Sequence, residues 1–524
     1  MAPFLFRSQH SRPSLRQRRV RPACHQFPGR DRPDSQPRCP PPSRRRARCQ
    51  IRGQSLSQAQ TAAPLSWPRR IGWASGDAGI NFYWQGVGIF AYFFYTDVMG
   101  ISPMWAGIAF AAASFWDAIT DPIMGAIADR TRTRFGRFRP WILFASVPCA
   151  VSFALMFWTP PLTGGWLVAY AIATHILLRT MLTAVGIPFS ALTARMTQDS
   201  NERGTIAMLR LMFAATGALA VSFTIPQLVE KLGDEQQAYF YAACILGVGA
   251  TIILLISFLS TSEPPADDDD LSVPTERRGI WRTFAADLIG FWSTLRHNGP
   301  LARLFAAVIL SGITTAMNGK VLLYWIKYDL KDPSVMSWLL ALPAVWLVLI
   351  APGWTWVARR WSKRTAWLSG TALSIVSLLS FYIINPHDHA TLIVITLIGA
   401  TGGSAGLIMF WSMLPDTVEY NQWVRGDRSE AKIFGFATFG QKTAYAINAL
   451  LLGQLLTAIG FVADQPQSPE ILLDLRGIMC LIPLAGVVGT IAIMWRYPIT
   501  AEFHAQLRAD LAERATVRAP AATA

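Results

Sequence analysis

The 524-residue sequence is poor in charged residues and lacks the motifs of an ATPase or a common enzyme. Charged side chains make up 15% of the chain, whereas 52% of the residues are hydrophobic. The sequence contains no G-x-x-x-x-G-K-[ST] phosphate-binding segment, which argues against an ATP-driven pump. No nucleophile and base occur with the spacing of a known catalytic set, so we do not expect an enzyme.

The six cysteines form no recognisable framework. Three lie within the first 50 residues, and Cys149, Cys244 and Cys480 lie within apolar stretches. The C-x-x-C spacing of metal and redox sites is absent, and so is the pattern of a secreted disulfide scaffold. We therefore expect the last three side chains to be small core residues.

Positive charge is concentrated at the start of the chain. The formal net charge is +15, and residues 1–52 contain fourteen arginines, no lysine and only two acidic residues. The rest of the chain is nearly balanced, so the charge gives no reason to expect a nucleic-acid partner. Residues 1–66 are rich in Arg, Pro, Ser and Gln, which predicts a disordered N-terminal extension. We interpret this segment as a non-functional extension from a mispredicted start site, with a basic tail on anionic lipid as the alternative. Its interspersed prolines argue against the amphipathic helix of a transit peptide.

Twelve apolar blocks separated by short polar connections follow residue 67. About 20 mostly apolar residues suffice for a helix to cross a bilayer, and a helix pairs its own backbone groups in lipid. The sequence therefore predicts an all-α polytopic membrane protein with twelve transmembrane helices. The blocks are 75–98, 102–128, 141–159, 164–190, 208–228, 236–260, 300–326, 333–357, 365–384, 390–414, 433–461 and 471–495.

The longest connection, 261–299, divides the blocks into two six-helix halves, 67–260 and 300–495, and a tail at 496–524 follows them. A division into six and six is typical of carriers whose halves rock around a central site. Arginine and lysine collect in the even-numbered loops, chiefly at 130–139 and 359–364. The positive-inside rule then places these loops, the central loop and both termini in the cytoplasm, with the protein in the inner membrane of the cell.

Two carboxylates lie in the second block, where lipid is expected. Asp117 and Asp121 are four residues apart, so on a helix they share one face. An acidic side chain at the bilayer centre costs roughly 2.5 to 3.5 kcal/mol, and such residues usually face a bundle interior or an ion path. The pair predicts a site for a small cation, either Na⁺ or a proton. The alternative is that Asp121 merely precedes a proline kink and Asp117 bonds to a neighbouring helix.

Further polar residues within the blocks are candidates for a central cavity. Asn81 and Gln85 are four apart in the first block, where they serve either as helix–helix contacts or as ligand contacts. Arg210 opens the fifth block, where it either snorkels to the surface or points into the cavity. Lys442 in the eleventh block needs an acidic partner to stay charged, and we hypothesise that it faces the acid pair across the cavity. The alternative is a lysine near the helix end that snorkels.

Charged residues near the cytoplasmic helix ends suggest a conformational lock. A basic cluster after the second block and acidic residues after the tenth suit ion pairs that hold this face in one conformation. Exposed pairs contribute little individually, so such a lock needs partial burial. The predicted gate residues are Gly125, Asp129, Arg130, Arg137, Asp416 and Glu419.

Several motifs resemble those of a known transporter family. They are YTDVMG at 95–100, WDAITDPIMG at 116–125 and the arginine-rich segment 132–141, supported by 187–189, 203–210, 416–420 and 429–442. They resemble the glycoside-pentoside-hexuronide cation symporters of the major facilitator superfamily, typified by the melibiose carrier. The resemblance covers essentially everything after residue 70.

This resemblance implies specific site residues. The implied coupling-cation site is Asp117 and Asp121 with Thr120 and Thr183, and the implied sugar cavity lies near Asn81, Arg210, Thr438 and Lys442. The chain departs from the melibiose carriers where Asn81 and Gly186 replace two sugar-binding acids and Ser190 replaces a tryptophan. Galactoside specificity therefore does not carry over, and a hexuronide whose carboxylate meets Arg210 or Lys442 fits equally well.

The sequence as a whole predicts a monomeric secondary symporter in the lipid bilayer. It would couple the flow of Na⁺ or H⁺ to uptake of a sugar, glycoside or hexuronide by alternating access, with a coupling ion and no cofactor. One alternative is a lysolipid or amphiphile carrier of the same fold, since related animal sequences move lysolipids. The other is a non-transporting membrane sensor.

Overall fold

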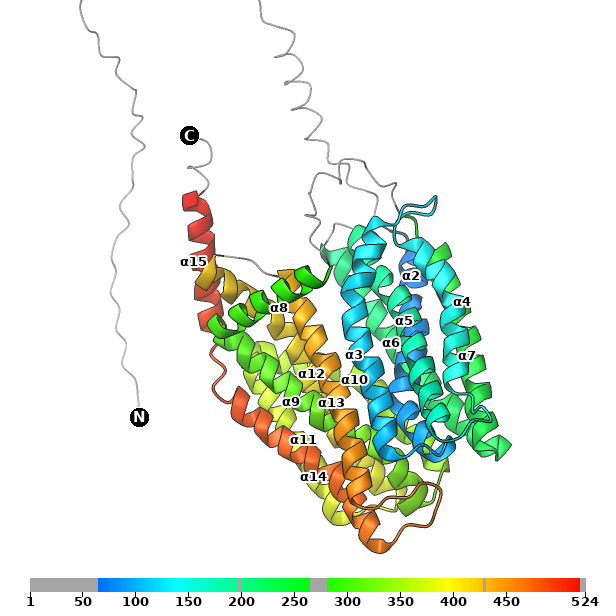
Figure 1. Ribbon diagram of the computed structural model, residues 1–524. Helices are drawn as coiled ribbons and strands as arrows, with labels where there is room; N and C mark the ends of the chain where they lie inside the picture. Colours follow the sequence, from blue (N-terminus) through cyan, green and yellow to red (C-terminus); the bar gives the residue numbers. More distant parts are fainter. Residues whose placement is uncertain (1–64, 197–199, 264–279, 427–429, 519–524) are drawn as a thin grey trace, which may run out of the picture. The chain divides into compact units, whose positions relative to one another are not determined.

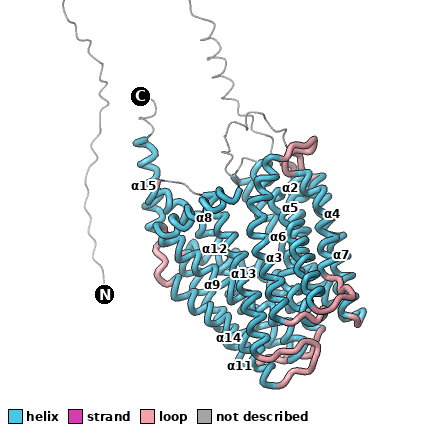
Figure 2. The backbone as a smooth tube through the Cα atoms, viewed as in Figure 1, coloured by secondary structure: helices cyan, strands magenta, loops and turns pink. Residues whose placement is uncertain are grey.

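The computed structural model describes residues 65–196, 200–263, 280–426 and 430–518 (Figure 1). Regular structure in these ranges is helical, apart from one isolated bridge between Thr133 and Gly136 (Figure 2). The helices are α2 (Trp67–Gln85), α3 (Pro103–Arg130), α4 (Arg139–Met156), α5 (Gly165–Met196), α6 (Ser200–Leu232), α7 (Glu235–Leu259), α8 (Ile280–His297), α9 (Gly299–Trp325), α10 (Ser334–Arg360), α11 (Lys363–Ile384), α12 (His389–Arg425), α13 (Glu430–Ala458), α14 (Pro469–Met494) and α15 (Ala501–Arg518). Short π-helical turns extend α2 and α9 at Gly86–Ala91, Phe94–Val98 and Ile326–Leu330.

Twelve of these helices coincide with the twelve apolar blocks, which confirms the prediction of an all-α polytopic fold. Two helices lie outside the blocks. Helix α8 occupies part of the connection that we expected to be a loop, and α15 lies in the expected tail. Both contain charged residues and are not continuous apolar runs, so a search for apolar blocks passes over them.

Nine helices of the described part of the chain are long and apolar enough to cross a membrane. They include α4, α5, α6 and α7 of the first half and α9, α10, α11, α12 and α14 of the second. The three remaining candidates, α2, α3 and α13, carry many of the polar side chains described below. Polar residues in a membrane helix are sheltered by neighbouring helices, and these three helices pack on others along their length.

Four helices provide the main contacts between the two halves. Helix α3 packs on α13, and α6 packs on α10. The approach of α3 to α13 is close, because a Cβ at Gly107 would lie 2.6 Å from the carbonyl oxygen of Ala449. A Cβ at Gly453 would likewise lie 2.6 Å from the carbonyl oxygen of Pro103. Small residues that let helix backbones approach closely are typical of membrane helix packing.

The buried apolar residues form two clusters. One belongs to the second half and includes Phe291, Trp367 and Phe436. The other joins the first half to residues of the second half such as Tyr324 and Phe461. The cluster runs through the first half as far as Phe138, but Tyr324 of the second half meets the first half at Phe93 and Thr96, just before α3 begins. We call the side of the basic segments 130–139 and 359–364 the arginine-rich end and the other side the opposite end. Apolar packing therefore joins the halves at the opposite end.

Candidate cation and substrate site

The two predicted cation-binding carboxylates meet at the contact between α3, α5 and α13. Asp117 is 2% exposed, and the hydroxyl of Thr183 lies 2.7 Å from its Oδ1 and 3.2 Å from Oδ1 of Asp121. The Lys442 ammonium lies 2.9 Å from Oδ2 of Asp117 and donates a hydrogen bond to Oδ2 of Asp121. The structure thus brings Asp117, Asp121, Thr183 and Lys442 together, although the last two come from other helices than the acids.

Two further side chains complete this charged cluster. The Arg179 guanidinium lies 3.6 Å from Oδ2 of Asp117. The ring of Trp84 lies under both cations, with its centroid 4.7 Å from the Arg179 guanidinium carbon and 5.9 Å from the Lys442 ammonium. An aromatic face attracts a cation at such distances. The cluster therefore contains two carboxylates and two basic side chains, and one of the basic side chains, Lys442, belongs to the other half of the protein.

The oxygen atoms of this cluster suit a small hard cation. Carboxylate and hydroxyl oxygens are the ligands that such cations take, and a carboxylate also accepts a proton. The residues that fit are Asp117, Asp121 and Thr183, because their oxygens already converge. The Thr120 hydroxyl donates to the backbone carbonyls of its own helix at Trp116 and Asp117 and makes no described hydrogen bond to either carboxylate, so its predicted part in the site stays a prediction. The cation-binding role of these residues stays a prediction.

Arg210, a predicted substrate contact, is paired with an acid that the sequence analysis did not single out. Its guanidinium forms an ion pair with the Asp77 carboxylate and donates to the Thr193 hydroxyl at 3.1 Å. Asp77 lies four residues before Asn81 in α2, and the Asn81 amide donates to the Asp77 carbonyl at 2.8 Å. The sequence did contain a clue to Asp77. This residue precedes the candidate residue Asn81 by four positions, and residues four apart share a helix face.

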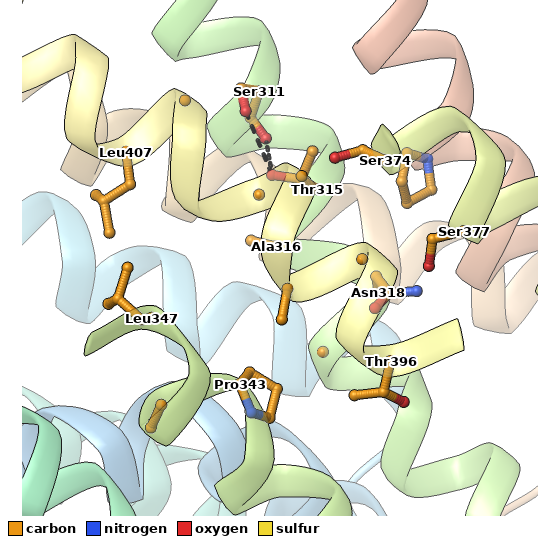
Figure 3. Close-up of a pocket in the computed structure, with 18 of the residues that line it drawn as sticks. Ser311, Thr315, Ala316, Asn318, Pro343, Leu347, Ser374, Ser377, Thr396 and Leu407 are labelled. Carbon is orange, nitrogen blue, oxygen red and sulfur yellow. Dashed lines mark hydrogen bonds between the residues drawn. The ribbon is translucent and has the colours of Figure 1, made fainter. Parts of the chain in front are cut away.

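A cavity of about 820 Å³ lies beside the charged cluster and is lined by both halves. Asn81 and Gln85 line it from the first half, and Gln441, the neighbour of Lys442 in the chain, lines it from α13. Most of the wall comes from α9, α10, α11 and α12 (Figure 3). Two predicted substrate residues thus line the cavity, whereas Arg210, Thr438 and Lys442 do not. Thr438 donates to the Phe434 carbonyl within its own helix.

A buried lysine lies between the halves outside this cavity. Lys320 of α9 is 5% exposed, and its ammonium donates to Oδ1 of Asn448 in α13 at 2.9 Å. The ammonium also lies 4.1 Å from the centroid of the Phe110 ring in α3. Asn448 was missed in the sequence, where a single asparagine in an apolar segment gives no pairing signal.

Ion pairs and hydrogen bonds join the halves at the opposite end. The Lys327 ammonium lies 3.5 Å from Asp97 and 3.3 Å from Glu235, both in the first half. The hydroxyl of Tyr328 donates to the Asp97 carboxylate, and the hydroxyls of Thr96 and Tyr324 lie 2.6 Å apart. Together with the shared apolar cluster, these contacts close the opposite end.

The two acidic gate residues at the arginine-rich end, Asp416 and Glu419, make ion pairs within their own half. Lys363 binds Asp416 at 2.7 Å, and His504 lies 2.8 Å from Glu419. In the first half, the backbone N–H of Phe138 donates to Glu263 at 2.9 Å. Asp129 and Arg130 are exposed, Arg137 is buried, and a Cβ at Gly125 would meet only Ile187, at 3.9 Å. In this conformation both acids, Asp416 and Glu419, thus pair with basic side chains of their own half. The gating role stays a prediction.

Comparisons with known proteins agree with this arrangement. The chain is 29% identical over 442 residues to the "Putative glycoside/cation symporter YagG" of Escherichia coli (strain K12), covering 83% of this chain and 93% of that protein. It is also 29% identical to the "Isoprimeverose transporter" of Lactiplantibacillus pentosus, covering 86% of this chain and 92% of that protein. The "Glucuronide carrier protein homolog" of Escherichia coli (strain K12) is 26% identical, with 87% and 97% covered.

A likeness in fold alone extends to more distant transporters. The solved structure of a proton-dependent oligopeptide transporter matches with a TM-score of 0.59 at 15% identity, covering 84% of this chain and 99% of that chain. The sequence pattern of the MFS/sugar transport protein family matches residues 72–501, nearly all of the helical part. The chain therefore belongs to the MFS/sugar transport protein family, as the resemblance of its motifs predicted.

Proposed function

We propose that this protein is a symporter that couples the flow of Na⁺ or H⁺ to the uptake of a sugar or glycoside. The observation that carries the proposal is the cluster of Asp117, Asp121 and Thr183 beside a cavity that both halves line. Relatives named as a glycoside/cation symporter and an isoprimeverose transporter support a sugar-type substrate. Gly186 and Ser190, two of the positions at which the chain departs from the melibiose carriers, are not among the described residues that line the cavity.

Lys442 occupies the place where a coupling cation would bind. Its ammonium already neutralises both carboxylates, so an entering cation competes with it for the same oxygens. A cation that wins this competition releases Lys442, which lies next to the cavity-lining Gln441. The released ammonium then has donors free for a sugar oxygen. Binding of cation and sugar is coupled in this way, and by thermodynamic linkage each tightens the binding of the other by the same factor.

Alternating access follows from the different contacts at the two ends. The structure is held closed at the opposite end by Asp97, Lys327 and their neighbours. Opening that end breaks these pairs, and the basic cluster can then approach Asp416 and Glu419 at the arginine-rich end. The positive-inside rule makes the arginine-rich end cytoplasmic, so the described conformation faces inward. Both termini then lie in the cytoplasm, with the protein in the inner membrane.

Purified protein in liposomes tests this function. Radiolabelled sugars from a neutral and acidic panel are supplied with an inward Na⁺ gradient, an inward H⁺ gradient or neither. We expect at least one sugar to accumulate above its external concentration under one gradient, and an ionophore that dissipates the gradient to prevent this. Uptake that only equilibrates under every gradient would contradict symport. A lysolipid taken up in place of any sugar would favour the amphiphile carrier.

A further inference from the structure

The cavity wall in the second half has polar side chains and no charged ones. Among the residues that the structure describes, none that lines this cavity is acidic or basic. Three of the helices that form this wall, α9, α11 and α12, carry hydroxyl and amide groups that Figure 3 shows around one space. We call this group the hydroxyl wall, and it consists of Ser311, Thr315 and Asn318 of α9, Ser374 and Ser377 of α11, and Thr396 of α12.

Most hydroxyl protons of this wall are already committed to the protein. Thr315 donates to the backbone carbonyl of Ser311 at 2.6 Å, so the 3.4 Å contact between the two hydroxyls uses the Ser311 proton (Figure 3). Ser377 donates to a carbonyl of α12 at 2.9 Å, and Ser374 donates within α11 at 3.4 Å. A hydroxyl has one proton and two acceptor lone pairs. These four residues therefore offer the cavity acceptors and no free donor.

Two asparagines at the cavity are also partly committed. Asn318 donates from its side-chain nitrogen to the Met479 carbonyl at 3.1 Å, and Asn81 donates to the Asp77 carbonyl at 2.8 Å. Each amide therefore keeps one N–H donor and the lone pairs of its oxygen. The basic side chains near the cavity are also engaged elsewhere. Lys442 binds the acid pair, and Arg210 binds Asp77.

We infer that the hydroxyl wall is a sugar subsite that accepts hydrogen bonds from the hydroxyls of an uncharged ring and rejects an acidic one. This inference rests on the proposed sugar transport and narrows its substrate. Sugar hydroxyls can donate to the acceptor lone pairs of the four committed hydroxyls, and they can accept a hydrogen bond from the second N–H of Asn318. A carboxylate or sulfonate has only acceptors, and no basic residue of the wall neutralises its charge. Lys442, which the coupling cation releases, is not a lining residue of the cavity, so burial of an acidic group against the hydroxyl wall is unfavourable. The volume of about 820 Å³ lies in the upper part of the roughly 300–1,000 Å³ range of ligand pockets, which suits a glycoside with more than one ring.

Matched pairs of neutral and acidic glycosides test the inference in the liposomes described above. Methyl glucoside is compared with methyl glucuronide, and methyl galactoside with methyl galacturonide, each as radiolabelled substrate and as competitor. We expect the neutral member of a transported pair to show an apparent affinity at least about tenfold higher than its uronide, the loss that one unpaired charged group causes. Equal or better uptake of the uronide overturns the inference and leaves symport standing. Failure of every sugar under every gradient overturns symport and this inference together.

A glycine in α12 allows the cavity itself to be tested. Gly406 lines the cavity, and a Cβ added there would meet nothing within 4 Å, so Gly406→Leu fills the space without a clash against the backbone. Gly353→Leu is the matched control, because Gly353 is exposed in α10 and does not line the cavity. We expect Gly406→Leu to lower neutral glycoside affinity at least about tenfold relative to the control.

Cation-dependent thermal stabilisation without sugar shows whether each variant is folded. Gly406→Leu should retain that stabilisation, because the acid pair lies outside the cavity. The inference is overturned if folded Gly406→Leu protein transports neutral glycosides like the Gly353→Leu control. If Gly406→Leu loses the cation-dependent stabilisation, the smaller Gly406→Ala variant takes its place. The inference is then overturned if folded Gly406→Ala protein transports neutral glycosides like the Gly353→Leu control.

Discussion

Replacing Asp117 by asparagine should abolish concentrative uptake and also destabilise the protein. The amide keeps the size of the side chain and can still accept the Thr183 hydrogen bond, so the change removes mainly one negative charge. Asp117 is 2% exposed and faces two basic groups, with Lys442 at 2.9 Å and Arg179 at 3.6 Å. After the substitution, Asp121 is the only carboxylate left for both.

The size of the effect follows from burial. Removal of one partner from a buried ion pair costs about 3–5 kcal/mol, because the remaining charge is left without compensation. Arg179 is 4% exposed and cannot reach solvent, so Asp117→Asn should lie in that range. Asp121→Asn should cost less, at most about 1–2 kcal/mol, because the Asp121 side chain is 18% exposed and Asp117 still holds both basic groups. Both variants should lose coupling, since each lacks a carboxylate of the proposed cation site.

Thermal unfolding in detergent and gradient-driven uptake in liposomes measure the two effects separately. Glu230→Gln serves as the control, because Glu230 is an exposed acid near the end of α6 and has no predicted role in the site or the gate. We expect a lower midpoint of unfolding for Asp117→Asn than for Asp121→Asn, and the native value for the control. The reasoning is refuted if Asp117→Asn concentrates substrate as the native protein does, or if Asp121→Asn is the less stable variant.

Three further predictions concern other contacts of the site. Thr183→Val removes the hydroxyl shared by both carboxylates and should weaken the apparent cation affinity about 10- to 100-fold, measured as the cation dependence of uptake. Unchanged cation dependence would exclude Thr183 from the site. Lys327→Gln breaks the pairs that close the opposite end, so a cysteine placed at the cavity residue Ser311 should react faster with a reagent supplied outside. An unaltered labelling rate would mean that these pairs do not hold the end closed. Gly107→Val forces a side chain against the Ala449 carbonyl and should destabilise the protein by about 1–3 kcal/mol in thermal unfolding. A native midpoint would show that α3 and α13 can separate at no cost.

The sequence by itself determined the membrane architecture and the position of the acid pair. Apolar blocks of bilayer length predict helices, because lipid offers no hydrogen-bond partner to backbone N–H and C=O groups and a helix pairs these groups internally. The spacing of Asp117 and Asp121 puts both on one helix face by geometry that needs no other part of the chain. The family motifs also lie in continuous segments, so the order of residues along the chain is enough to find them.

Only the tertiary structure decided which polar side chains meet. Lys442 lies 321 residues from Asp121 in the chain, so the sequence supports their pairing by charge cost alone, whereas the structure brings the two groups into contact. Arg210 shows the opposite outcome, because its partner Asp77 lies 133 residues away and the sequence offered no reason to join them. The contacts at the opposite end and the choice of cavity wall likewise depend on how α3 packs on α13 and α6 on α10. The spacing of residues along the chain determines which side chains share a helix face. Which side chains meet between two helices depends on how the helices pack, and the pattern of residues along one sequence does not reveal that packing.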